Sequence, residues 1–369
     1  MTHHIQYERL LPSAPGTSRT VGIHRFGVPG ALPKIYLQGA LHADELPGAY
    51  ILHHLIERLR KADRAGAIKG EIVVVPLANP IGLAQRIQAI HAGRSDLGLG
   101  GNFNRNYADL SAPLHEHLGR FAPEAISEET VRAFLRLEVE AITQKTELDS
   151  LKKTLLALAI DADYVFDLHC DDEAPVYVYL SDENHPQAVS LTRDLGARAA
   201  IAGTSEMATF KDACARPWQI ASRIAGRPLH GCLAATIEYR GTRDVNEETA
   251  QSDAKRLYAF MQRVKILDGE PEPLPPAFSP ITPLAGVEHL QADRPGIIVF
   301  RRQPGEQIAA GETVAEIVDP VSGDRSLIKT FAGGVFFGHV ATRLAVPGST
   351  IASLAGIAPR MQTGEEAYP

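Results

Sequence analysis

Short apolar runs alternate with amphipathic segments up to about residue 270. The apolar runs predict strands and the amphipathic segments predict helices, most clearly where leucines recur at helical spacing between Leu148 and Leu158. This alternation predicts an α/β domain with a mostly parallel or mixed sheet. The expected strands lie at 35–37, 72–76, 164–168, 176–180 and 233–239, and the expected helices at about 50–64, 128–141 and 147–159.

Beyond residue 270 the pattern changes. Prolines cluster from Pro271 to Pro283 and exclude helices and central strands, so residues 271–284 are predicted to form a semi-rigid linker between domains 1–270 and 285–369. Short β-rich runs and Pro-Gly turns then predict a small all-β domain. Its Pro-Gly-Glu-x-Ile and Ala-Gly-Glu-Thr-Val repeats resemble the barrel-sandwich domains of biotinyl and lipoyl carriers. Lys329 lacks the flanking residues of a modified carrier lysine.

Composition excludes several classes of protein. The chain has 369 residues, 44% hydrophobic and 22% charged, with a net charge of −7, which argues against a general nucleic-acid binder. Its three cysteines are scattered, so no disulfide framework is expected and a reducing compartment fits. The N-terminus lacks an apolar leader and no run of eighteen apolar residues occurs. We therefore expect a cytoplasmic protein without membrane spans.

Candidate metal ligands follow two predicted strands. His42 and Glu45 come after the strand at 35–37, and His169 ends the strand at 164–168. Ligands gather outside the carboxyl ends of strands in open α/β sheets, and a catalytic zinc takes three nitrogen or oxygen ligands and leaves one position open. Glu238, at the end of a third strand, is a candidate base for a metal-activated water.

A candidate anion clamp lies between these strands. Asn104 and Arg105 follow the glycines at 100 and 101, and the planar guanidinium fork matches a carboxylate group. Arg86 and Arg94 lie on the same connection. The sequence therefore predicts recognition of a substrate carboxylate.

The order of these motifs resembles the succinylglutamate desuccinylase/aspartoacylase family of the zinc carboxypeptidase superfamily. That family shows His-x-x-Glu, Asn-Pro, Asn-Arg, a strand-end His and a strand-end Glu before a glycine, and here the resemblance spans about residues 35–245. It implies a zinc-carboxypeptidase-like mixed sheet flanked by helices, with a β domain that helps to cover the active-site mouth. The matching residues are His42 and Glu45, Asn79-Pro80, Asn104-Arg105, His169 and Glu238.

The resemblance also implies roles for these residues. One zinc ion per chain would be held by His42, Glu45 and His169, and Glu238 would act as general base and acid. Asn104 and Arg105 would hold the substrate's carboxylate. An upstream arginine would polarise the scissile carbonyl; Arg94, which follows Gly93, is favoured for this over Arg86, which stays a substrate-binding candidate.

Two departures from the family pattern stand out. Ala43 replaces the glycine that commonly follows the first histidine, and the connection from Asn79-Pro80 to Asn104-Arg105 is longer than is typical of aspartoacylases. The longer connection leaves the natural substrate open. No motif encloses His53 or His54, for which an ordinary surface or core position is expected.

The function expected from the sequence is zinc-dependent hydrolysis of an N-acyl amino acid or related small carboxylate-bearing amide. The alternative is a metallocarboxypeptidase acting on peptides or peptidoglycan fragments. A third possibility is a metal-dependent binding or regulatory protein without catalysis. The expected partner is a small-molecule substrate, a homo-oligomer is possible, and nucleic acid and membrane are not expected.

Overall fold

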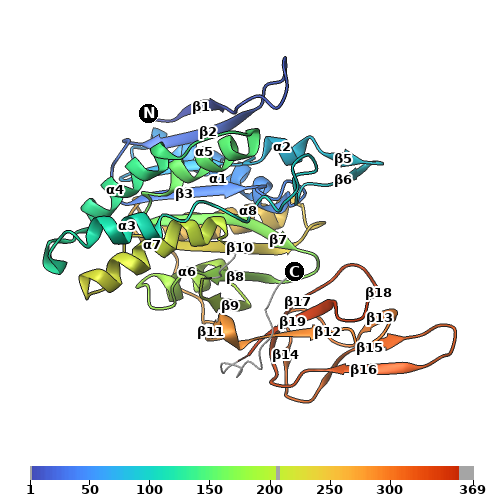
Figure 1. The fold of residues 1–369 in the computed structure, drawn as a ribbon. Coiled ribbons are helices and arrows are strands. Elements are labelled where there is room, and N and C mark those ends of the chain that lie inside the picture. Colours follow the sequence, from blue (N-terminus) through green and yellow to red (C-terminus); the bar gives the residue numbers. More distant parts are fainter. Residues whose placement is uncertain (1, 205–207, 357–369) are drawn as a thin grey trace.

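A nine-stranded mixed sheet forms the centre of the protein (Figure 1). The computed structural model describes residues 2–204 and 208–356. The strand order is β1-β2-β4-β3-β7-β10-β8-β9-β11, and the run from β4 to β10 is parallel. The strands are β1 (His4–Arg9), β2 (Thr20–Gly27), β3 (Lys34–Gly39), β4 (Glu71–Val75), β7 (Tyr164–Asp171), β8 (Val176–Leu180), β9 (Ala199–Ala202), β10 (Leu233–Gly241) and β11 (Ile281–Pro283).

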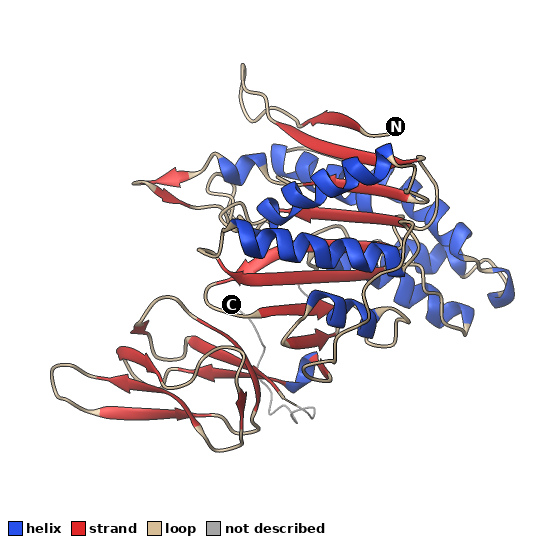
Figure 2. Ribbon diagram, turned by 180° about the vertical axis from the view of Figure 1, so that it is seen from behind, coloured by secondary structure: helices blue, strands red, loops and turns tan. Residues whose placement is uncertain are grey.

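Helices cover both faces of this sheet (Figures 1 and 2). One face packs against α1 (Pro47–Arg64), α6 (Ala188–Leu195) and α8 (Glu247–Arg263). The other packs against α3 (Ser111–Leu118), α4 (Glu128–Ala141), α5 (Glu147–Ala159) and α7 (Phe210–Ala225). Both faces are therefore apolar, which explains the continuous hydrophobic runs of the central strands.

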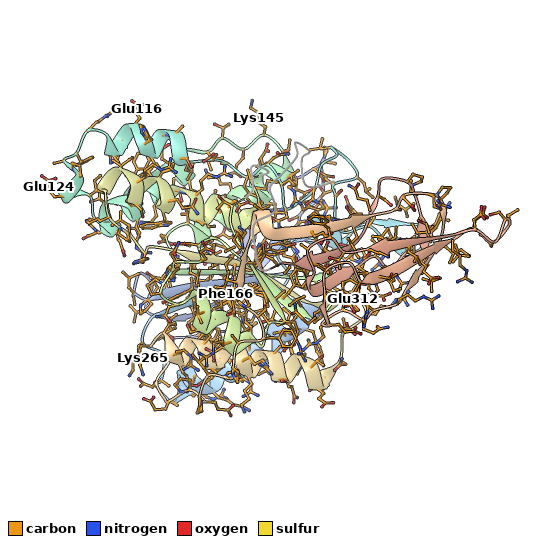
Figure 3. The ribbon with its side chains drawn as sticks, turned by 90° about the horizontal axis from the view of Figure 1, so that it is seen from below. Glu116, Glu124, Lys145, Phe166, Lys265 and Glu312 are labelled. Atoms are coloured by element: carbon orange, nitrogen blue, oxygen red, sulfur yellow. The ribbon has the colours of Figure 1, made fainter. Side chains whose placement is uncertain are left out.

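The alternation of side chains along a strand divides the core into two halves. In β3, Ile35 and Leu37 enter one buried cluster, and Tyr36 enters the other. Figure 3 shows this layering from below, with Phe166 inside the sheet and Glu116 and Lys265 on opposite helical sides. The expected α/β architecture is confirmed.

Some helices and strands have the predicted bounds, and others differ from the sequence prediction. The bounds of α4 and α5 coincide with it, because Ser127 and Thr146 cap the two helices through their side chains. Helix α1 begins at Pro47 rather than near Tyr50, since proline is well suited to the first helical turn. The sequence did not predict the antiparallel pair β1–β2, in which no residue of β1 is buried.

The connection after β4 carries short elements. They are α2 (Pro80–Leu83) and the two strands β5 (Arg86–Ile87) and β6 (Ile90–His91), which form a small antiparallel ribbon. Gln88 and Ala89 adopt positive φ angles at its turn. Figure 1 shows this ribbon projecting from the α/β body on the same side as the C-terminal β strands.

The C-terminal part consists of two four-stranded antiparallel sheets around their own apolar cluster. This agrees with the expected small all-β region, of which residues 357–369 lie outside the described residues. Part of the predicted linker behaves otherwise: β11 pairs in parallel with β9 and extends the main sheet. The strands are β12 (Val287–Gln291), β13 (Gly296–Phe300), β14 (Gln307–Ile308), β15 (Thr313–Val318), β16 (Arg325–Lys329), β17 (Gly334–His339), β18 (Leu344–Ala345) and β19 (Thr350–Ala355).

The C-terminal part is attached to the segment that follows β7. Glu173 accepts a hydrogen bond from the backbone of His339 and another from the Arg343 side chain at 2.7 Å, and Asp172 accepts one from the backbone of Ala341. The β strands therefore lie against the carboxyl end of the main sheet. Over residues 2–204 and 208–356, no helix is both long and apolar enough to cross a membrane.

Candidate metal centre

The carboxyl ends of β3, β7 and β10 meet at one edge of the sheet. Because β7 and β10 are parallel neighbours in register, Glu238 lies directly beside His169. His42 and Glu45 follow β3, the neighbour of β7 on its other side. The sheet topology therefore brings together four residues from three segments that are far apart in the sequence.

Close packing fixes helix α1 against β7. A Cβ atom at Gly48 would lie 2.7 Å from the Cβ of Leu168, so only glycine permits this approach. Glu45 precedes the helix by two residues and is thereby held next to His169. The tight start of α1 thus positions one predicted ligand against another.

The Glu45 carboxylate lies between two imidazole rings. Its Oε1 is 2.9 Å from His42 Nδ1, and its Oε2 is 2.7 Å from His169 Nδ1. All three side chains are buried, and the candidate ligand atoms lie within 4.8 Å of one another. Two imidazole nitrogens and one carboxylate are a donor set that zinc binds.

Nε2, the ring nitrogen that faces away from Glu45, also has a hydrogen-bond partner in each histidine. His42 Nε2 is 2.7 Å from Asn102 Oδ1, and this oxygen also accepts the backbone N–H of Asn104. His169 Nε2 is 2.8 Å from a carboxylate oxygen of Asp167. Because both partners are acceptors, each Nε2 carries the proton in the neutral ring and the lone pair of each Nδ1 faces Glu45. This is the tautomer that metal binding through Nδ1 requires.

Neighbouring charges shift the pKa values at this centre. Burial raises the pKa of Glu45, but His169 and His42 outweigh it and hold the value well below the ordinary one. Burial lowers the pKa of His169, but Asp167 and Glu45 raise it well above the usual range. Without a metal, a proton on His169 balances these carboxylates. A dication would displace that proton, so the residues present fit zinc.

Glu238 is distinguished by an unused oxygen. Its Oε2 is buried and makes no hydrogen bond, while other parts of the side chain reach solvent. Burial raises the pKa of Glu238 to about 8; the charges of Glu45 and Asp171 add to this, and those of His169 and Arg94 oppose it. A carboxyl group with one buried, unpartnered oxygen beside a metal donor set is placed to exchange protons. A dication nearby would favour its ionised form.

The structure brings Arg94 to this centre. Its Nη1 lies 3.0 Å from Glu45 Oε1, and its side chain is 58% exposed, so it stands at the mouth of the site. Gly93 permits this, because a Cβ there would lie 2.2 Å from the backbone nitrogen of Asp44. Arg86 instead lies exposed on β5, in the projecting ribbon. Its substrate-binding role stays a prediction.

Asn104 and Arg105 have contacts that differ from a simple clamp. Asn104 is buried, its Oδ1 accepts the backbone N–H of Phe210, and its Nδ2 lies 3.4 Å from Asp167. Arg105 donates to the carbonyl of Asn104 at 2.8 Å. These contacts give Asn104 a positioning task behind His169. Substrate binding by Asn104 and Arg105 stays a prediction.

Sequence reasoning missed Asn102 and Asp167. Asp167 precedes His169 by two residues on one strand, so both side chains lie on the same face, a spacing that signals a paired acid and histidine. Asn102 had a weaker signal. The position of Asn102 depends on its pairing with Ser95 across the loop, and no local sequence pattern predicts this pairing.

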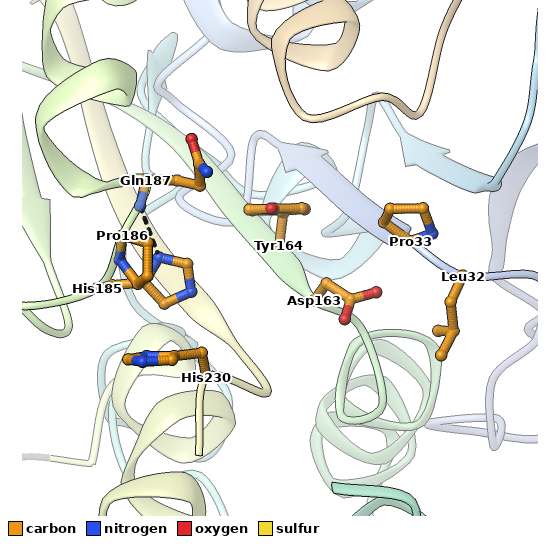
Figure 4. Close-up of a pocket in the computed structure, with 8 residues that line it drawn as sticks. All are labelled: Leu32, Pro33, Asp163, Tyr164, His185, Pro186, Gln187 and His230. Atoms are coloured by element: carbon orange, nitrogen blue, oxygen red, sulfur yellow. Dashed lines mark hydrogen bonds between the residues drawn. The ribbon is translucent and has the colours of Figure 1, made fainter. Parts of the chain in front are cut away.

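A cavity of about 370 Å³ lies at the opposite edge of the sheet (Figure 4). It is lined by residues that precede β3, β7 and β10, among them Pro33, Asp163 and His230, and by His185 after β8. No predicted site residue lines it. The hollow is therefore separate from the metal donor set.

Fold and site together define an α/β protein with a His-Glu-His donor set at the carboxyl edge of a mixed sheet. The model of the succinylglutamate desuccinylase/aspartoacylase catalytic domain matches residues 31–264, more than half of the chain. The chain belongs to this family of enzymes, as the order of its motifs indicated. No curated protein has significant sequence similarity to the chain.

Solved structures show the same fold. A succinylglutamate desuccinylase/aspartoacylase family protein from Shewanella frigidimarina is 21% identical with a TM-score of 0.82, covering 97% of this chain and 98% of that one. A family protein from Shewanella amazonensis is also 21% identical, with a TM-score of 0.80 and coverage of 95% and 98%. The product-bound ectoine utilization protein EutE (DoeB) from Ruegeria pomeroyi is 16% identical, with a TM-score of 0.64 and 96% coverage of both chains.

Proposed function

We propose that this protein is a zinc-dependent amidohydrolase that cleaves the amide bond of an N-acyl amino acid or a related small carboxylate-bearing amide. The observation that carries the proposal is the arrangement around Glu45. Two Nδ1 lone pairs and one carboxylate converge there, and the unpartnered oxygen of Glu238 lies on the neighbouring strand. Membership of the desuccinylase/aspartoacylase family supports the choice of a deacylation.

His42, Glu45 and His169 are the residues that would hold the metal. A zinc ion bound by three protein ligands supplies a Lewis acid that lowers the pKa of water and polarises a carbonyl oxygen. Asn102 and Asp167 keep the two rings in the required tautomer and orientation. Their contribution is to preorganise the donor set.

Glu238 supplies proton transfer. In its ionised form it takes a proton from the water that attacks the amide carbon, and it then delivers that proton to the leaving amine nitrogen. Its unpartnered Oε2 is available for both transfers. Arg94 stands at the site mouth, where its guanidinium stabilises the negative charge that develops on the carbonyl oxygen.

Arg105 is proposed to recognise the carboxylate of the substrate. It is partly exposed on the loop that also carries Asn102 and Asn104, and a guanidinium fork can bind a carboxylate through two parallel hydrogen bonds. Asn104 supports this loop by fixing it to the start of α7. The same loop therefore carries Asn102, which orients the metal ligand His42, and Arg105, which would orient the substrate.

A hydrolysis screen tests this function. Zinc-loaded protein is incubated with N-acetyl, N-succinyl and N-formyl amino acids and with short peptides, and release of the free amine is measured. Glu238→Gln protein prepared in the same way is the control. We expect at least one N-acyl amino acid to be cleaved faster by the parent than by the control.

Other outcomes separate the alternatives. Cleavage of the peptides alone would make the protein a metallocarboxypeptidase. Equal rates for parent and Glu238→Gln protein on every compound would contradict a hydrolase and favour a metal-dependent binding protein.

A further inference from the structure

A second group of metal-type donors lies away from the centre already described. His53, His54 and Glu57 lie on consecutive turns of α1, and their candidate ligand atoms are all within 4.8 Å of one another. Glu247, the first residue of α8, approaches the same place from the neighbouring helix. We call these four residues the α1–α8 cluster.

His54 is the unusual member of this cluster. Its side chain is only 8% exposed, yet its buried Nε2 makes no hydrogen bond within the described part of the chain. Its Nε2 lies 3.4 Å from Glu247 Oε2 without the geometry of a hydrogen bond. The buried imidazole therefore lies between two carboxylates, those of Glu57 and Glu247. Gathering carboxylates around a buried ring carries a desolvation cost, which a metal ion bound there would offset.

His54 Nδ1 is the ring nitrogen that faces Glu57, the carboxylate donor of the cluster. His54 Nδ1 is 3.9 Å from one Glu57 oxygen, and His53 Nε2 is 3.9 Å from the other. Ligand atoms around a tetrahedral zinc are about 3.3 Å apart, given bond lengths of about 2.0–2.2 Å. Because His53 and Glu57 are more than half exposed, small side-chain rotations can close the difference.

His54 Nε2, the other ring nitrogen, faces the carboxylate of Glu247. With a metal on Nδ1, the proton of the neutral ring resides on Nε2, which faces Glu247. The Tyr50 hydroxyl donates a hydrogen bond to the same Glu247 oxygen and so fixes its position. Asp167 and His169 show the same histidine–carboxylate arrangement in the first centre.

We propose that His53 Nε2, His54 Nδ1 and Glu57 bind one divalent transition-metal ion such as zinc, and that Glu247 orients His54. Two carboxylates and two neutral imidazoles leave two negative charges, which a dication neutralises. Nitrogen donors favour zinc, copper or nickel over magnesium and calcium. This second site is independent of the proposed hydrolysis and would tie α1, which begins just after Glu45, to the start of α8.

Zinc content tests the proposal. Full-length protein is dialysed to equilibrium against a series of buffered Zn²⁺ concentrations, and bound zinc per chain is measured by elemental analysis. His53→Ala combined with Glu57→Gln changes two exposed side chains and should bind one zinc ion fewer than the parent. Turnover should be unchanged, because neither residue belongs to the first centre.

Matched variants exclude a nonspecific effect. His115→Ala with Glu116→Gln removes an exposed histidine and glutamate from α3 and should bind as much zinc as the parent. Glu247→Gln should keep the second site but weaken its zinc affinity by about tenfold, because orienting carboxylates contribute at least that much. The proposal is overturned if the His53→Ala/Glu57→Gln protein binds as much zinc as the parent.

Thermal unfolding gives a second readout. In a His169→Ala background the first centre is disabled, so added Zn²⁺ should raise Tm through the α1–α8 cluster. Adding His53→Ala and Glu57→Gln to that background should abolish the rise. A zinc-dependent Tm increase of the same size in both backgrounds would refute the second site.

Discussion

The two edges of the main sheet contain similar residues but differ in what their side chains do. At the carboxyl edge, donor atoms of His42, Glu45 and His169 converge, and an oxygen of Glu238 has no partner. At the amino edge, Asp163 accepts hydrogen bonds from the Lys34 backbone and from Arg132. Converging donor atoms therefore identify a site better than residue composition does.

The cavity and the metal donor set lie at opposite edges of the sheet, so cavity volume does not locate the candidate site. The hollow of about 370 Å³ in Figure 4 lies at the amino edge, where His185 Nδ1 accepts the backbone N–H of Gln187. In the described part of the chain, neither group of three metal-type donors lies there. Polar atoms of this cavity, such as His185 Nδ1, already make hydrogen bonds within the fold, so few of them remain to bind a ligand.

Electrostatics separates the two edges as well. Burial raises the pKa of Glu238 to about 8 at one edge and lowers the pKa of His185 to about 4 at the other. Burial favours the neutral form in both cases. At the carboxyl edge the Glu45 carboxylate converges with two imidazoles, whereas Asp163 at the amino edge is paired with Arg132. The same physical effect therefore has a functional meaning at one edge alone.

The largest contrast between the edges should come from Glu238. We expect Glu238→Gln to lower kcat by roughly 10² to 10⁴, because a positioned proton-transfer group is lost, while zinc content and Tm stay near the parent's. His185→Asn, the matched change at the amino edge, should leave kcat unchanged. Steady-state kinetics and elemental analysis on the same preparations decide this. Loss of zinc from Glu238→Gln would instead make Glu238 a ligand.

The two arginines of the long connection provide the next contrast. Arg94→Ala should reduce kcat/KM by roughly 10² to 10³, since it removes a group that stabilises developing negative charge. Arg86→Ala should have a smaller effect, confined to KM, because Arg86 lies exposed on β5 and its predicted role is substrate binding. Kinetics on the best substrate of the screen compares them. Equal losses for both variants would mean that the ribbon folds over the site during the reaction.

Two aspartates, Asp163 just before β7 and Asp167 within it, test the support of the metal centre. Asp167→Asn should weaken zinc binding by about 10- to 100-fold, because the carboxylate behind His169 is lost. Asp163→Asn should lower stability by removing the partner of Arg132, without changing the zinc affinity. Competition with a zinc chelator measures both affinities. A normal affinity in Asp167→Asn would show that the ring of His169 keeps its orientation without the carboxylate.

Local patterns predicted much of the fold and the donor set. Helices α4 and α5 have strong caps and periodic leucines, so their ends were readable. His42, Glu45 and His169 were predictable because each follows an apolar strand, and the sheet topology then brings them together. Zinc itself and the role of each side chain remain predictions, since the structure shows only that these three side chains converge.

Other features depend on contacts distant in the sequence. The pairing of β11 with β9 makes a proline-rich segment part of the main sheet, and no periodicity of hydrophobic residues predicts this pairing. Asn104 looked like a substrate ligand because it neighbours Arg105, yet its amide is buried against Phe210 and Asp167. The buried state of His54 likewise arises only when α8 packs against α1. Tertiary packing decides these positions.

The smallest effect should appear in the acid stability of the amino edge. Burial, and after it the charge of His230, lowers the pKa of His185 from its ordinary value of 6.5 to about 4 in the folded protein. Below pH 6.5 the unfolded chain therefore binds a proton that the folded chain does not, and stability falls with falling pH. Between pH 7 and pH 5.5 this should cost about 1 kcal/mol. His185→Asn keeps an acceptor for the Gln187 N–H and cannot titrate, so it should lose less stability over this range than the parent. Urea unfolding at both pH values measures the difference, with exposed His115→Asn as the control. An unchanged pH dependence in His185→Asn would show that the cavity at the amino edge admits enough water to solvate the charged ring.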